Sequence, residues 1–208
     1  LPIIDQLIEA GIDVFKIEGR AKGPEYIHTV TKAYRTAIDL VKENKFNQKE
    51  ALILVKELEK VFNRGFTTNF FLGTPTNDSW TKFYGSSATE KKIKVGKVIN
   101  YYAKKGIASI QIEQEPINQD DKIFFSGPTT GYLESEIGEM WINEKPANKS
   151  KRGDEVTFEV KKKVRTSDTV YKIVKRDVNE EEENIKKQYE KTGIHKPFKF
   201  LGKDKGMD

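Results

Sequence analysis

The chain has 208 residues, of which 36% are hydrophobic, 33% are charged and none is cysteine. This composition excludes a disulfide, a thiolate metal site and a cysteine nucleophile within the chain. A formal charge of +5 weakly favours an anionic partner such as nucleic acid, although a lysine-rich surface without any ligand gives the same excess. No apolar run approaches the length of a membrane span and no secretory signal pattern is present, so we expect a cytoplasmic protein.

The first third of the chain has the pattern helix, strand, helix. Apolar residues at helical spacing end at Gly11, and the apolar run Ile12–Ile17 predicts a buried strand. Pro24 suits the first position of a helix whose apolar stripe extends from Tyr26 to Val41. This pattern is the repeating unit of a parallel α/β fold. Because Leu1 lies within a helix already under way, we expect a fragment from the C-terminal part of a longer protein.

A further amphipathic helix is predicted from Ala51 to Phe62. Asn47 and Glu50 resemble a capping box before it, with Asn in place of the usual Ser or Thr. Residues 71–90 lack a clear period and predict a connector. We therefore expect residues 1–70 to be the end of a truncated catalytic α/β barrel.

From Lys91 onward the hydrophobic pattern has a period of two, which is typical of strands. Strands are predicted around Val95–Ile99, Ala108–Ile112, Lys122–Ser126, Glu134–Ile142, Glu155–Lys162 and Thr169–Val174. Turns are predicted between them, including Lys104–Gly106 and Lys145–Pro146. About half a dozen short strands at this spacing indicate a small antiparallel β-barrel, closed or nearly closed, over residues 91–176. Residues 177–208 predict a charged helix, Asn179–Thr192, followed by a tail.

Lys16, Glu18 and Arg20 are the candidate catalytic residues. If Ile12–Ile17 is a barrel strand, its C-terminal end faces the catalytic mouth, where the two cations suit a carboxylate or phosphate. A structural ion pair inside the barrel is the alternative. The sequence Ile17-Glu18-Gly19-Arg20 also equals a protease tag of expression vectors, so the flanking sequence must decide whether it is native.

The predicted β-barrel carries many basic residues with interleaved aromatic residues, a combination typical of RNA-binding barrels. Candidate RNA-binding residues are Lys97, Lys104, Lys105, Lys151, Arg152, Lys161 and Lys163. The alternative is a solvated lysine-rich barrel whose aromatic residues form the core. The sequence shows no metal-ligand spacing, so we expect no metal site in this chain.

These residues together resemble a known family. Leu7 to Arg20, followed by Tyr34-Arg35, is similar to the signature near the end of the catalytic barrel in the collagenase-like peptidase family U-32. Asn63 to Thr67 is similar to a further short motif of that family, and Val95 to Val98 to the start of a C-terminal barrel in its longer members. Because the similarity extends to both sides of Ile17–Arg20, that stretch is native sequence.

The resemblance implies that members of this layout hydroxylate RNA, above all the prephenate-dependent subgroup that makes hydroxyuridine at the tRNA wobble position. It implies an iron-sulfur cluster on upstream cysteines, which this chain lacks, and tRNA and prephenate as partners of the whole enzyme. The fragment is then expected to be inactive alone. The C-terminal barrel also resembles domain II of elongation factors. The alternatives are a peptidase, as the family name implies, and a protein-interaction module.

Overall fold

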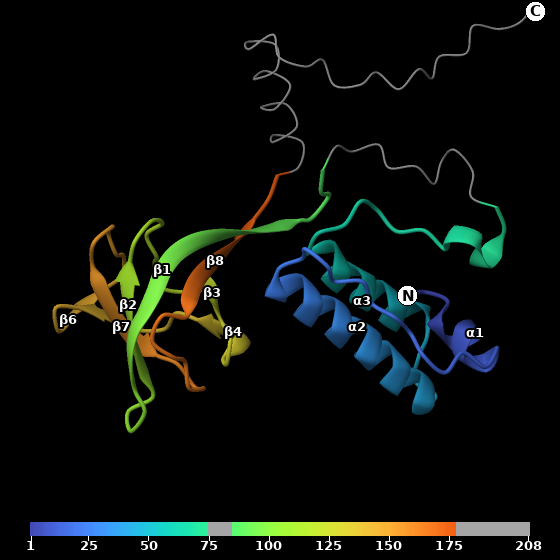
Figure 1. Ribbon diagram of the computed structural model, residues 1–208, viewed down its shortest axis with the longest axis horizontal. Helices are drawn as coiled ribbons and strands as arrows, with labels where there is room; N and C mark the ends of the chain where they lie inside the picture. Colours follow the sequence, from blue (N-terminus) through green and yellow to red (C-terminus); the bar gives the residue numbers. More distant parts are fainter. Residues whose placement is uncertain (75–84, 178–208) are drawn as a thin grey trace, which may run out of the picture. The chain divides into compact units, whose positions relative to one another are not determined.

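The computed structural model describes residues 1–74 and 85–177 (Figure 1). Residues 1–176 form one compact unit, and 177–208 form a second, of which only Asp177 is described. The predicted charged helix and tail therefore lie outside the described residues.

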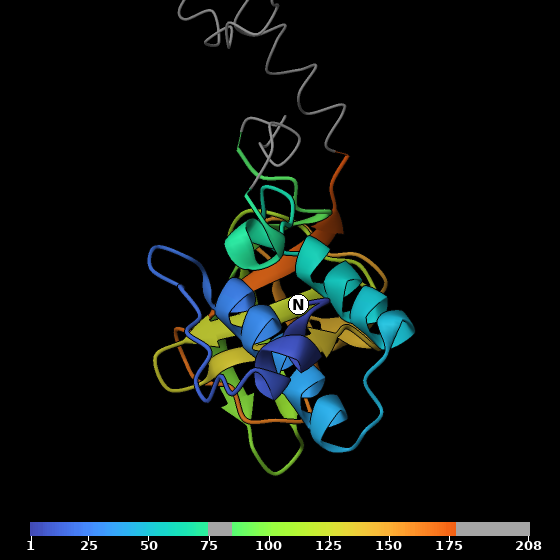
Figure 2. The same ribbon diagram turned by 90° about the vertical axis from the view of Figure 1, so that its right-hand side faces the viewer.

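Three α-helices form the first part of the compact unit: α1 (Ile4–Glu9), α2 (Pro24–Lys42) and α3 (Gln48–Glu59). Helices α2 and α3 lie side by side in both views (Figures 1 and 2). Pro24 is the first residue of α2, and the Asn47 side chain accepts hydrogen bonds from the backbone N–H groups of Lys49 and Glu50, so both predicted helix starts are confirmed. A 3-10 turn, η1 (Asn69–Leu72), follows.

The prediction of a strand at Ile12–Ile17 is wrong. The segment contributes two side chains to the helical core: Phe15 and Ile17 pack there, while Val14 is 80% exposed. Its backbone, however, pairs with no strand of the described residues. A strand exists only when a neighbour accepts and donates its backbone hydrogen bonds, and residues 1–74 provide no such neighbour.

The second part is an antiparallel sheet of eight strands with the order β4-β3-β8-β1-β2-β7-β5-β6. The strands are β1 (Glu90–Tyr102), β2 (Ile107–Ile112), β3 (Lys122–Gly127), β4 (Gly131–Glu136), β5 (Met140–Ile142), β6 (Lys145–Ala147), β7 (Glu155–Glu159) and β8 (Thr169–Lys175). Together with the turns between them, they are called the sheet domain below. The helices followed by an antiparallel sheet confirm the coarse prediction of an α+β chain in which helical elements precede an antiparallel sheet.

Three sequence predictions for the sheet need correction. The single strand expected at Glu134–Ile142 is two strands, β4 and β5, and the turn expected at Lys145–Pro146 is part of β6. The outermost strands, β4 and β6, are not paired with each other among the described residues, so the barrel is not closed by hydrogen bonds. The short β6 carries Pro146, which protects an edge from further pairing.

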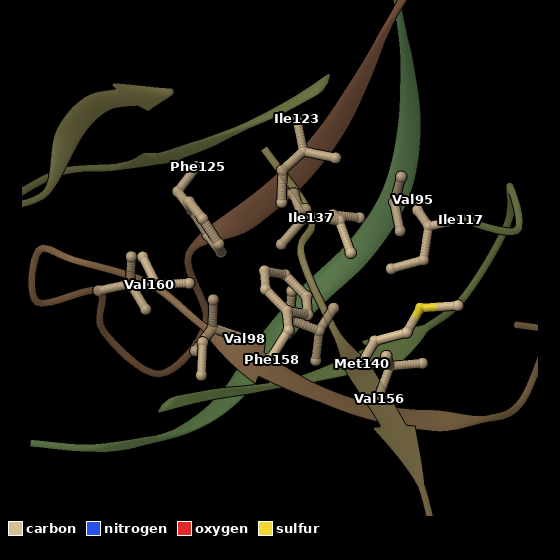
Figure 3. Close-up of a cluster of buried hydrophobic side chains, with 14 of the residues drawn as sticks. Val95, Val98, Ile117, Ile123, Phe125, Ile137, Met140, Val156, Phe158 and Val160 are labelled. Carbon is tan, nitrogen blue, oxygen red and sulfur yellow. The ribbon is translucent and has the colours of Figure 1, made fainter. Parts of the chain in front are cut away.

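One hydrophobic cluster holds the sheet domain together. Phe158 is fully buried at its centre, surrounded by side chains that include Val98, Phe125 and Met140 (Figure 3). The long strand β1 connects the two parts of the sheet around this cluster, because its first half pairs with β8 and its second half with β2. Register shifts after Lys94 and Val98 accompany this change of partner.

Candidate nucleic-acid interface

Two loops meet at one end of the sheet domain. The β1–β2 turn contains Lys104 and Lys105, and the segment after β7 contains Lys161 to Lys163. The backbone nitrogen of Val160 donates to the carbonyl oxygen of Gly106 at 2.7 Å, and the Tyr101 hydroxyl donates to the carbonyl oxygen of Val160 at 3.1 Å. These two bonds join the loops and bring their lysines to the same end.

We call this surface the cationic end. It consists of Lys104, Lys105, Lys161, Lys162, Lys163 and Arg165, all of which are exposed. Within the part of the chain that the structure describes, none of the six forms an ion pair. Their charges are therefore available to an external anion. The candidate RNA-binding residues from the sequence include four of these six, Lys104, Lys105, Lys161 and Lys163. They do not include Lys162 and Arg165, which lie in the same loop as Lys161 and Lys163.

Three of the predicted RNA-binding residues lie elsewhere. Lys97 is in β1, where it and Lys94 each contact the carboxylate of Glu113 at 3.1 Å. Hydrogen bonds from these two lysines hold the pKa of Glu113 below its usual value. Lys151 and Arg152 lie at the other end of β2, because the nitrogen of the next residue, Gly153, donates to Ile112.

Most of the aromatic residues that suggested base stacking are part of the core. Phe124, Phe125 and Phe158 are fully buried, whereas Tyr102 is 47% exposed. Tyr102 is the last residue of β1 and directly precedes the turn that carries Lys104 and Lys105. Its exposed ring can therefore stack on a base close to these two lysines. The solvated-barrel alternative is thus right for most of the aromatic residues.

The predicted catalytic residues lie on the surface of the first part of the chain. Lys16, Glu18 and Arg20 are all exposed. The Glu18 carboxylate accepts a hydrogen bond from the backbone nitrogen of Arg20 at 2.8 Å, and no ion pair joins any two of the three. The alternative of a structural ion pair is therefore not seen either.

Sequence reasoning missed a groove between α2 and the β3–β4 turn. Its walls include His28, Lys32 and Arg35 from α2 and Tyr132 from β4. The groove was difficult to find because about 100 positions separate the two segments, and the Tyr34-Arg35 pair of the family signature gives no indication that α2 faces β4. In residues 1–74 and 85–177 no group of three or more His, Cys, Asp or Glu is arranged to hold a metal ion. No helix in these ranges combines the length and apolar character of a membrane span.

Comparison with known proteins identifies the family of the first part of the chain. Residues 1–81 match the profile of peptidase family U32, so the chain carries a domain of this family. It is 38% identical over 174 residues to a protein named collagenase from Porphyromonas gingivalis, which covers 84% of this chain and 42% of that protein. It is 35% identical over 142 residues to tRNA hydroxylation protein P1 of Bacillus subtilis, covering 66% of this chain and 32% of that protein. The chain thus spans less than half the length of either relative.

Among solved structures, the chain is similar to the C-terminal domain of a U32 family protein from Geobacillus thermoleovorans. The match covers 38% of this chain and 96% of that domain at 21% identity, with a TM-score of 0.36. The barrel of the catalytic part and the likeness to elongation-factor domain II stay predictions.

Proposed function

We propose that this chain is part of an RNA-modifying enzyme that hydroxylates the wobble uridine of tRNA, and that its sheet domain binds the RNA. The cationic end is the observation that carries the proposal. It places six exposed basic side chains, without ion pairs in the described residues, on two loops joined by a backbone hydrogen bond. The name of the B. subtilis relative supports tRNA as the nucleic acid.

Phosphate contacts from this end would supply affinity and position rather than sequence specificity. Each lysine that neutralises a phosphate releases a counterion, so binding weakens as salt concentration rises. Tyr102 would add a sequence-tolerant stacking contact. The sheet domain is thus suited to hold an RNA while another part of the enzyme selects the base.

The chemical step is proposed for residues outside this chain. An iron-sulfur cluster needs cysteine thiolates, and the chain has no cysteine, so its residues do not fit this cofactor. We place the cluster and the prephenate-dependent chemistry in the upstream part of the longer protein. Lys16, Glu18 and Arg20 would then contribute charged groups to the mouth of the completed site.

Two measurements test the proposal. Mass spectrometry of tRNA nucleosides should show loss of wobble hydroxyuridine in a strain that lacks the full-length gene. The purified 208-residue chain should bind tRNA at low salt, with affinity falling as salt is raised. An unchanged nucleoside profile removes the hydroxylase assignment, and absence of tRNA binding at 50 mM salt by both chain and full-length protein removes the RNA role.

A peptidase is the second candidate, because the P. gingivalis relative is named collagenase. In the described residues, the histidine available to a catalytic triad is His28, whose ring packs on Tyr132 with centroids 4.6 Å apart. The peptidase candidate predicts that highly purified full-length protein cleaves a collagen-derived peptide and that Glu18→Gln abolishes cleavage. Activity that persists unchanged in this variant, or disappears on further purification, argues against it.

A further inference from the structure

The groove between α2 and the β3–β4 turn has the size of a small-ligand site. Its volume is about 690 Å³, within the range usual for such sites. Helix α2 supplies one wall with His28, Lys32 and Arg35, which share a face because they are three or four residues apart. Tyr132, Gly127 and Gly131 come from the opposite side.

A column of aromatic rings ends in this groove. Tyr171 stacks on Phe124 at 5.0 Å, Phe124 contacts Tyr132 at 4.9 Å, and Tyr132 contacts His28 at 4.6 Å between ring centroids. His28 is the last ring of the column and is exposed. A planar base placed on His28 would extend the column by one ring, which is a favourable and sequence-tolerant contact.

The charges on the helix wall favour an anion. Lys32 is exposed and forms no ion pair in the described part of the chain. The Arg35 guanidinium bonds Asp39 through Nε and Nη2, which leaves some of its five N–H groups for a ligand. The opposite wall carries negative charge: burial and the carboxylates of Glu134, Glu25 and Glu90 raise the pKa of the Tyr132 hydroxyl. Glu134 accepts a hydrogen bond from this hydroxyl, and Glu25 pairs with Lys92.

The floor lets a ligand approach the backbone at Gly131. Gly127 and Gly131 pair across the base of the β3–β4 turn, and nothing lies within 4 Å of the position that a Cβ of Gly131 would take, whereas Asp168 fills that position at Gly127. A Cβ at Gly127 would collide with the carboxylate of Asp168, which is buried and accepts from Thr130 and from the nitrogen of Arg165. Gly127 is therefore required at this point, where the β3–β4 turn contacts the loop that carries Arg165 and Asp168.

We propose that the groove binds one nucleotide unit, with its phosphate between Lys32 and Arg35 and its base against His28. The shared chemistry is a phosphate next to a planar ring, which either a nucleotide of an RNA chain or a free nucleoside monophosphate provides. The RNA form of the inference rests on the proposed function. It is favoured because Arg165 of the cationic end contacts Thr130 at 3.4 Å, directly before Gly131 of the groove.

The test uses the 208-residue chain and two matched double variants. Lys32→Gln/Arg35→Gln removes two charges from the groove, and Lys42→Gln/Lys56→Gln removes two exposed charges from α2 and α3 outside it. The probes are uridine monophosphate, inorganic phosphate and a fluorescent oligouridylate of ten nucleotides. Nitrogen-15 NMR spectra report folding of each variant and the amide shifts of Gly131 and Tyr132.

We expect uridine monophosphate to shift these amides at lower concentration than phosphate does, and the groove variant to weaken oligouridylate binding about 10-fold with the control unchanged. Mononucleotide binding that the groove variant abolishes, with oligouridylate affinity unchanged, identifies a free nucleotide as the ligand. Equal losses in both variants, or no amide shift with any probe, overturn the site. The proposed function fails separately, if tRNA binding is absent while uridine monophosphate still occupies the groove.

Discussion

The backbone nitrogen of Val160 donates a 2.7 Å hydrogen bond to the carbonyl oxygen of Gly106, and this bond joins the two lysine-bearing loops of the cationic end. The two residues are 54 positions apart, so no local pattern reveals their contact. The pairing of β2 with β7 brings them together, because Ile107 lies opposite Glu159. Loops that continue from paired strand ends share one end of the sheet, and their charges add to one local field.

The first prediction compares the two ends of the sheet domain. We expect Lys104→Gln/Lys105→Gln to weaken tRNA binding on the order of 10-fold at 0.1 M salt and to reduce the slope of log K against log salt by roughly 1.4 to 1.8. Lys151→Gln/Arg152→Gln, at the other end, should change both quantities little. Fluorescence anisotropy over a salt series measures them. Equal effects of the two variants would mean that binding is not confined to the cationic end.

The hairpins of the sheet domain could be predicted because their signals are local. Alternating apolar residues on both sides of Lys104–Gly106 give β1, β2 and their turn. The extent of β4 and β5 could not be predicted, because Gly138 divides an alternating stretch whose halves pair with different strands. The strand predicted at Ile12–Ile17 failed for the complementary reason: its sequence is suitable, but the described residues offer it no partner.

The candidate sites, too, could be predicted from local sequence only in part, because they depend on contacts between distant residues. Residue type singled out lysines of the cationic end, but it could not distinguish them from Lys97, which Glu113 engages. Nor could it find the groove, since His28 and Tyr132 meet only through the packing of α2 against β4. Charge is visible in a sequence, whereas the ion pairs and contacts that decide whether it is available depend on the fold.

The second prediction concerns Gly96, which lies where β1 changes its pairing partner from β8 to β2. Gly96 pairs with Ile112 on one side and Val170 on the other, and a Cβ there would overlap the carbonyl oxygen of Gln111. We therefore expect Gly96→Ala to lower the free energy of unfolding by more than about 2 kcal/mol. Gly138→Ala is the control, because nothing lies within 4 Å of its Cβ position, and it should change stability by less than about 0.5 kcal/mol. Urea denaturation measures the free energy of unfolding of both variants. If the Gly96→Ala chain is as stable as the control, the close approach of Gly96 to Gln111 does not require a glycine.

The third prediction concerns the start of α3. The Asn47 side-chain oxygen accepts from the nitrogens of Lys49 at 2.9 Å and Glu50 at 3.1 Å. Asn47→Ala removes this cap and should cost about 1 kcal/mol of unfolding free energy. Asn47→Asp keeps an acceptor and should retain most of the stability. If urea denaturation shows equal losses in the two variants, the acceptor is not what stabilises the helix start.

The last prediction concerns the acid dependence that Glu113 gives to the fold. Hydrogen bonds from Lys94 and Lys97 hold its pKa below the ordinary value of 4.5, so unfolding raises its affinity for a proton. A lowered pKa in the folded state means that the contribution to stability is complete above about pH 4.5 and is lost as pH falls through the lowered value. Glu113→Gln should therefore narrow the difference in urea midpoint between pH 7 and pH 3.

The control for this change is Glu115→Gln. Glu115 is two positions away and forms no ion pair in the described ranges, so its removal should leave the acid dependence close to that of the unmodified chain. Added salt at 1 M should shrink the Glu113 effect, because the three side chains are partly exposed and salt screens their attraction. If both variants show the same pH dependence, Lys94 and Lys97 do not engage Glu113 in solution. Lys97 would then be free to join the RNA contacts that the sequence predicted for it.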